Sequence, residues 1–347
     1  MSKRELYPFT AIIGLDDMKE GLILNAINPN IGGILIFGQK GTAKSTAVRA
    51  LSKVLPEIEV VKGCRFGCDP KNEDTMCEEC LSRIKRGGIL ESYFRPMKVV
   101  DLPIGVTEDR LIGTLDIEEA IKNGKKKFEA GILASANRGI LYIDEINLLD
   151  DHIVDLLLDS AAMGVNTIER EGISYSHPAK FILVATMNPE EGEVRPQLLD
   201  RFGLSVEVKG ISDIKKRVDI VKLRGEFESN PKEFQNKFNN KEKELKEKIE
   251  KTRVKLKEVT ISDELLLVNA MLGSKFNIDG HRGDITLMKA AMTRAALYER
   301  SEVIKEDIEK VAPMVLFHRM RKLPFEKMKI LDSNLIKETI NSFEEKI

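Results

Sequence analysis

The chain has 347 residues, of which 42% are hydrophobic, and its 55 Lys and Arg nearly balance 56 Asp and Glu, giving a formal net charge of −1. That length is sufficient for one large domain and a smaller one, and the near-zero charge excludes a general attraction to nucleic acid or to an anionic membrane. No run reaches the roughly 18 apolar residues of a membrane helix, and the N-terminus has no signal-peptide core, so we expect a cytoplasmic protein without membrane or nucleic-acid partners.

The first strong signal is an apolar run, residues 34–37, followed by a glycine-containing loop and a helical pattern. This order suits a phosphate-binding loop, because glycines let the backbone wrap the phosphates, a lysine supplies positive charge and a hydroxyl ligates Mg²⁺. We predict that Lys44 contacts the phosphates of ATP and that Ser45 ligates Mg²⁺. The predicted nucleotide-binding residues are Gly38, Gln39, Lys40, Gly41, Thr42, Ala43, Lys44, Ser45 and Thr46.

Ala43 departs from the usual form of this loop, in which glycine precedes the lysine, and its methyl group restricts the backbone. A glycine-rich turn is therefore the alternative interpretation of the segment. The choice between the two depends on the segments that follow.

All four cysteines lie in an insert directly after the first nucleotide-binding helix. They are Cys64, Cys68, Cys77 and Cys80. In a cytoplasmic chain this grouping favours metal ligation over disulfides, and four thiolates suit one tetrahedral zinc ion. An iron–sulfur cluster and free or redox-active thiols stay open as alternatives, because the spacing of the first pair is less standard than the final CxxC.

Two later apolar runs end in polar residues. Residues 139–143 lead into Asp144 and Glu145, and residues 181–187 lead into Asn188. Asp144 is predicted to hold Mg²⁺ through water, Glu145 to polarise the attacking water and Asn188 to orient it. The alternatives are a solvated turn at the acidic pair and an ordinary turn at Asn188, which precedes proline.

Strands that alternate with helices predict an α/β fold, with a mostly parallel sheet covered by helices and chemistry at the carboxyl ends of its strands. We assign residues 1–225 to this domain. The composition then shifts to Lys, Glu and Asn, which favours a charged, exposed helical linker over 226–260, with a disordered spacer as the alternative. Apolar residues at helical spacing over 261–347 predict a small helical domain, with Ser262 and Asp284 placed to begin helices.

Long segments of the chain resemble the AAA+ ATPase subunit of magnesium chelatase and the related motor subunits of cobalt chelatase. The segments are PFTAIIGLDDMKEGLILNAINPNIGGILI, GTAKSTAVRAL, DLPIGVTEDRLIGTLDIEEAI, ANRGILYIDEINLLDDHIVDLLLDSA and NPEEGEVRPQLLDRFGL. The form GTAKS, with alanine, is also similar to the loop of chelatase-type motors. The resemblance covers nearly the whole chain, and it implies an AAA+ P-loop NTPase with a C-terminal helical lid domain.

The resemblance further implies a ring, hexameric in this family, with ATP held between neighbouring subunits. Arg201 matches the arginine finger that acts on the neighbour's ATP, with Arg195 as a second candidate. Arg282 matches the lid arginine that reaches the nucleotide of its own chain. A surface charge or a structural ion pair is the alternative for each of them.

Three inserts are expected within the first domain. They are a cysteine-containing insert at about 62–98, an insert in the second helix at about 101–116 and a hairpin at about 166–180. The resemblance implies that the last two are moving parts. It also implies two partners that carry what this sequence lacks, an AAA+ subunit with an integrin-like domain and a large porphyrin-binding subunit.

The predicted function is that of an ATPase motor that drives metal insertion into a tetrapyrrole by a separate catalytic subunit, with ATP and Mg²⁺ as cofactors. A remodeller that installs metal cofactors in other proteins would use the same ATPase residues. A helicase-like motor is disfavoured, because the net charge is nearly neutral and no separate DNA-binding domain is evident.

Overall fold

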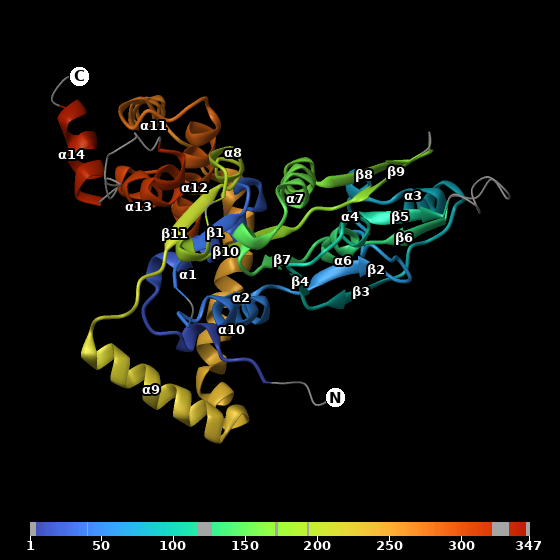
Figure 1. Cartoon of the computed structure of the whole chain (residues 1–347), viewed down its shortest axis with the longest axis horizontal. Coiled ribbons are helices and arrows are strands. Elements are labelled where there is room, and N and C mark those ends of the chain that lie inside the picture. Colours follow the sequence, from blue (N-terminus) through green and yellow to red (C-terminus); the bar gives the residue numbers. More distant parts are fainter. Residues whose placement is uncertain are drawn as a thin grey trace.

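The computed structural model describes residues 5–39, 41–116, 127–170, 173–192, 194–320 and 333–344. Its centre is a sheet of five parallel strands in the order β11, β1, β10, β7, β4 (Figure 1). The strands are β1 (Ile34–Phe37), β4 (Val99–Leu102), β7 (Ile140–Ile143), β10 (Ile182–Met187) and β11 (Leu204–Glu207). Their registers are parallel throughout, which confirms the predicted parallel sheet.

Helices cover both faces of this sheet, as predicted. Those before β11 are α1 (Asp16–Ile27), α2 (Lys44–Val54), α3 (Glu78–Lys85), α4 (Glu108–Ile112), α6 (Ile132–Ala136), α7 (Asp151–Met163) and α8 (Pro196–Leu199). Those after it are α9 (Ile214–Ser229), α10 (Pro231–Lys255), α11 (Asp263–Lys275), α12 (Arg282–Leu297), α13 (Lys305–Leu316) and α14 (Ser333–Glu344). No helix in the described ranges is long and apolar enough to cross a membrane.

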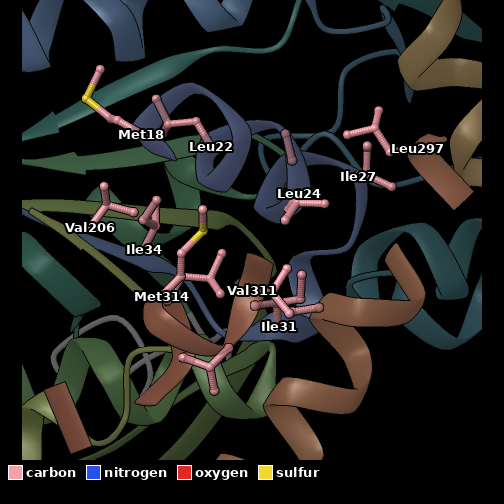
Figure 2. Close-up of a cluster of buried hydrophobic side chains, with 14 of the residues drawn as sticks. Met18, Leu22, Leu24, Ile27, Ile31, Ile34, Val206, Leu297, Val311 and Met314 are labelled. Atoms are coloured by element: carbon pink, nitrogen blue, oxygen red, sulfur yellow. The ribbon is translucent and has the colours of Figure 1, made fainter. Parts of the chain in front are cut away.

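Alternate residues of β1 pack into two different hydrophobic clusters, as the two-residue period of a strand requires. Ile34 and Ile36 face one cluster, which runs from α1 into the lid helices, and Met314 of α13 packs there (Figure 2). Leu35 faces the other cluster, which includes α7 and three of the cysteines. The lid therefore shares its core with one face of the sheet.

Among the described residues, three antiparallel pairs lie outside the central sheet. They are β2 (Ile58–Val61) with β3 (Ser92–Arg95), β5 (Gly113–Asp116) with β6 (Lys127–Ala130), and β8 (Val165–Arg170) with β9 (Ile173–Pro178). Figure 1 shows all three, together with α3, at the end of the molecule remote from the lid. Because β4 belongs to the central sheet, the insert expected from residue 101 overlaps the last two residues of a core strand.

The charged segment that was expected to form one exposed helix is divided between two. The helix α9 ends at Ser229, and α10 starts at Pro231, where the side chain of Asn230 accepts a hydrogen bond from the Glu233 amide at 3.2 Å. This pairing of cap and proline is a strong start signal. The helix α10 is also partly buried, since Phe234 and Ile249 are almost fully covered.

The predicted helix starts in the lid are close to those observed. Ser262 caps α11 by accepting a hydrogen bond from the Leu265 amide at 3.4 Å. Asp284 lies in the first turn of α12, which begins at Arg282.

Candidate functional site

The predicted phosphate-binding loop joins the carboxyl end of β1 to the N-terminus of α2. Gly38 and Gly41 have φ angles of +152° and +82°, and a Cβ on Gly38 would lie 2.4 Å from the Val208 carbonyl oxygen. These two positions therefore require glycine. Of the predicted nucleotide-binding residues, Lys40 lies outside the described residues.

Ala43 is the residue before α2, and its φ of 60° places it in the left-handed region. An L-residue there is strained by roughly 1–2 kcal/mol, which is the physical reason that glycine is usual at this position. The chain accepts this strain at the start of the helix whose amides face the loop.

Lys44 is held by the loop itself. Its ammonium group donates hydrogen bonds to the carbonyl oxygens of Gly38 and, at 3.0 Å, Gln39. Partial burial lowers the pKa of Lys44, and the charges of Asp144 and Glu145 oppose that shift. The acidic pair is thus close enough to the lysine to influence it electrically.

The acidic pair is fixed by a residue that the sequence interpretation missed. Thr186, on β10, donates a hydrogen bond of 2.6 Å to Oδ1 of Asp144 and accepts one of 3.1 Å from the Glu145 amide. The Tyr142 hydroxyl donates to the same Asp144 oxygen at 2.9 Å, and burial raises the pKa of that hydroxyl. A hydroxyl at the end of an apolar strand was the available sequence signal.

Asn188 follows β10, and β10 lies between β1 and β7 in the sheet. The fold therefore brings Asn188 between the phosphate-binding loop and the acidic pair. Its side chain accepts a hydrogen bond of 3.3 Å from the Glu190 amide, and Gln39 of the loop donates one of 3.2 Å to the Glu190 carboxylate. Glu190 thus links the loop to the Asn188 turn, a contact that local sequence patterns do not reveal.

A cavity of about 490 Å³ adjoins the loop. Thr42, Ala43 and Thr46 form one wall of it. The rest is contributed by the N-terminal segment, by residues 209–211 before α9 and by one side of α9, with a mainly apolar set of residues that includes Tyr7, Ile12, Ile13, Ile211, Ile220 and Val221. An apolar cavity beside a phosphate-binding loop suits the flat base of a nucleotide. This cavity is not predictable from local sequence patterns, because its walls come from segments far apart in the chain.

Arg201 lies at the opposite edge of the sheet from Lys44. The amide of Gly203 donates to the Gly32 carbonyl at 3.1 Å, so this segment lies beside the residues that precede β1. The guanidinium of Arg201 pairs with Asp159 and, at 3.7 Å, with Asp155. The second candidate, Arg195, pairs with Asp151 of the same helix, α7.

Arg282, for which the resemblance implied contact with the nucleotide of its own chain, pairs in this structure with Asp200, the residue before Arg201. Its guanidinium pairs with the Asp200 carboxylate at 2.8 Å. Asp200 is also bound by Arg319, which follows α13 and donates further hydrogen bonds to the Phe202 and Gly203 carbonyls. The lid thus contacts residues 200–203, which lie just before β11 at the N-terminal end of that strand.

The fold brings the four cysteines together. Their sulfurs all lie within 4.8 Å of one another, with Cys68, Cys77 and Cys80 buried and Cys64 partly exposed. Hydrogen bonds with Cys68 and Cys77 lower the pKa of Cys64 well below its usual range, whereas burial raises the pKa of Cys80. Four sulfurs in one place form a donor set for a soft, tetrahedral metal ion.

Comparisons with known proteins agree with this arrangement. The family described as "Magnesium chelatase, subunit ChlI" matches residues 117–196, and the AAA lid domain matches residues 269–339. Among curated relatives, the magnesium-chelatase subunit ChlI homolog of Methanocaldococcus jannaschii is 54% identical over 99% of this chain and 93% of its own length. The chloroplastic ChlI subunit of Glycine max is 50% identical over 96% of this chain and 79% of its own length.

Solved structures give the same result. A complex between the BchI and BchD subunits of magnesium chelatase contains a chain that is 44% identical, with a TM-score of 0.55 over 97% of this chain and 100% of that chain. A Cytophaga hutchinsonii protein with 19% identity and a TM-score of 0.60, over 97% of this chain and 91% of its own, shares the fold. The chain therefore belongs to the ChlI family of magnesium chelatase subunits, which are AAA+ ATPases.

Proposed function

We propose that this chain is the motor of a magnesium-chelatase-type complex, in which a ring of copies couples ATP hydrolysis to metal insertion into a tetrapyrrole by a separate catalytic subunit. The observation that carries the proposal is the separation of the ATPase residues. Lys44 and the acidic pair lie at the carboxyl edge of the sheet, whereas Arg201 lies beside its N-terminal edge.

The residues at the carboxyl edge can bind ATP and Mg²⁺ and activate the attacking water. They leave one role to Arg201, which is to stabilise negative charge on the transferred phosphoryl group. Ser45 and Asp144 offer the oxygen ligands that Mg²⁺ prefers, and the bound ion would neutralise charge on the phosphate oxygens. Lys44 binds the phosphates. Glu145 polarises the attacking water, with Asn188 orienting it, and takes up its proton as the oxygen bonds to the terminal phosphorus and the bond to ADP breaks.

Arg201 cannot complete this site within one chain. The four residues of β1 separate the two edges of the sheet, and at about 3.3 Å per residue this exceeds 10 Å before the loop is counted. A neighbouring copy would bring Arg201 to the terminal phosphate. Arg282 would approach the same phosphate, because it pairs with Asp200, the residue before Arg201. We therefore propose that both arginines act on the ATP of the neighbouring subunit.

We propose a closed ring of identical subunits, hexameric in line with the family, because the loop edge of one copy must meet the Arg201 edge of the next. The proposed partners are an AAA+ subunit with an integrin-like domain and a large porphyrin-binding subunit. The BchI and BchD complex of the similar structure supports the first of these. A zinc ion at the cysteine cluster would take no part in ATP hydrolysis.

Purified chain, combined with the two partner subunits, a porphyrin, Mg²⁺ and ATP, tests the proposal. We expect metalloporphyrin to form, followed by its absorbance, and to be lost with Glu145→Gln. The control Glu264→Gln, at an exposed lid position, should retain activity. ATP hydrolysis without metal insertion, combined with recovery of unrelated proteins when the chain is isolated from its cells, would instead favour a remodeller of other clients.

A further inference from the structure

The cysteine-containing loop has little of its own to hold it in shape. In residues 62–80, Phe66 and Met76 are the only large apolar side chains, and most other residues are charged, polar or glycine. The entropy cost of ordering such a segment is roughly 1–2 kcal/mol per residue, and burial of two large apolar side chains does not offset that cost. The loop nevertheless places three of its cysteines at 2% exposure or less.

The spacing of the sulfurs fits a single ion. Zinc binds thiolate sulfur at about 2.3 Å, and a regular tetrahedron with that bond length has sulfurs about 3.8 Å apart. The Cys64 and Cys77 sulfurs are 3.8 Å apart, and all four lie within 4.8 Å of one another. In a four-iron cluster each cysteine binds a different iron, which holds the sulfurs farther apart than one shared ion does.

The backbone supports the same assignment. The Cys77 amide donates a hydrogen bond of 3.2 Å to the Cys68 sulfur, which stabilises negative charge on that sulfur. Cys77 also precedes α3, so the N-terminal end of that helix faces the cluster. Both features point N–H groups toward sulfurs that would carry negative charge when bound to a metal ion.

The loop in turn supports two hairpins. The ring of Phe66 stacks on His177 of β9 at 5.0 Å between centroids and on Phe128 of β6 at 6.2 Å. Arg65, next to Cys64, donates a hydrogen bond of 2.9 Å to the Phe128 carbonyl. Figure 1 shows α3 and the hairpins β5–β6 and β8–β9 side by side.

The base of the hairpins is tied to the loop as well. Asn137, just before β7, donates to the Phe66 carbonyl at 2.9 Å. Arg138 pairs with Asp69 of the loop at 2.8 Å. These contacts lie at the N-terminal edge of β7, whereas Asp144 lies at its carboxyl end. The loop is thus remote from the nucleotide site of its own chain.

We propose that Cys64, Cys68, Cys77 and Cys80 bind one zinc ion, and that the zinc-bound loop clamps the hairpins β5–β6 and β8–β9 against the base of β7. Zinc here is a folding ion that organises the loop. The clamp sets how far the hairpins can move, and it does not depend on the proposed chelatase function.

The test uses the full chain, purified anaerobically without added metal. We expect close to one zinc per chain by elemental analysis, with zinc–sulfur distances of about 2.3 Å by X-ray absorption. Cys77→Ser with Cys80→Ser should lose the metal. The matched control Glu73→Gln, at an exposed position of the same loop, should retain it.

Hydrogen exchange tests the clamp. Stripping zinc from the wild-type chain with a chelator should speed amide exchange in residues 165–178 about tenfold or more, with restoration on adding zinc back. ATP binding should be unchanged. Because this measurement uses the wild-type sequence, it holds even where the double variant fails to fold.

Two results would overturn the zinc site: four freely titratable thiols without metal, or iron recovered together with sulfide. Zinc that is present but can be removed without any change in exchange at residues 165–178 would overturn the clamp. Loss of ATP binding on zinc removal would show that the loop and the nucleotide site are not separate.

Discussion

The hydroxyl of Thr186 donates a 2.6 Å hydrogen bond to the carboxylate of Asp144 across two neighbouring strands. Thr186→Val keeps the shape of the side chain and removes this bond. We expect ATP turnover to fall about 10- to 100-fold, as is usual for residues that orient metal ligands. The control is Thr252→Val, since the buried Thr252 hydroxyl donates a hydrogen bond of 2.6 Å to the Lys248 carbonyl of its own helix. Equal turnover in the two variants would show that Thr186 does not contribute to ATP hydrolysis.

Glu145→Gln should retain ATP binding and block hydrolysis, because only the carboxylate that polarises water is lost. Lys44→Ala should instead weaken binding itself, because it removes the cation on the phosphates. Equilibrium binding of a fluorescent ATP analogue and a phosphate-release assay separate the two effects. A Glu145→Gln chain that no longer binds ATP would show that Glu145 has a structural role.

Arg201→Ala should leave ATP affinity nearly intact and lower turnover about 10³-fold or more, as loss of an arginine finger does. Mixing it in equal amounts with Lys44→Ala should restore activity at about a quarter of the interfaces, where an intact loop meets an intact finger. Replacing Arg201→Ala by Arg195→Ala in this mixture tests the second candidate. Rescue that requires an intact Arg195 would identify Arg195 as the finger. The shared site is wrong if mixed rings form and remain inactive.

Ala43→Gly should stabilise the nucleotide-free chain by about 0.5 kcal/mol, because relief of left-handed strain exceeds the entropy that glycine gains on unfolding. Ala50→Gly, in the interior of α2, should destabilise the chain by about 1 kcal/mol or more. Urea unfolding of both variants tests this opposition of sign. Destabilisation by both would show that Ala43 is unstrained.

Stability should fall as the pH drops below about 6.5, because burial and the neighbouring Arg319 hold the pKa of His318 well below its usual range. The unfolded chain then gains a proton that the native chain does not bind, which costs about 1.4 kcal/mol per pH unit. His318→Gln should flatten the change in urea midpoint between pH 7.5 and 5.5. The control His281→Gln, at a largely exposed histidine, should show the same change in urea midpoint as the unaltered chain. An unchanged slope in His318→Gln would contradict this assignment.

The sequence predicts those parts of the site that are signalled locally. Lys44, Asp144 and Asn188 each follow an apolar strand, and parallel strands bring such residues to one edge of a sheet. The convergence of the cysteines was likewise predictable from their spacing.

Features that depend on docking between distant segments were not predictable. The pair between Arg282 and Asp200 joins residues 82 positions apart, and it exists because the lid packs on β11. The cavity beside Thr42 likewise needs walls from both the N-terminal segment and α9. The break at Asn230 and Pro231 is different, since its cap signal was present in the sequence and was overlooked.

Arg319 connects the lid to the segment that carries Arg201. Burial lowers the pKa of this guanidinium to about 10. It donates hydrogen bonds to the Asp200 carboxylate and to the carbonyls of Asp200, Phe202 and Gly203, while Arg319 itself follows α13. A lid that rotates must therefore carry the neighbouring finger with it. We expect movement of one subunit's lid to shift its Arg201 relative to the ATP bound by the neighbouring subunit. Hydrolysis at adjacent sites of the ring would then be coupled rather than independent.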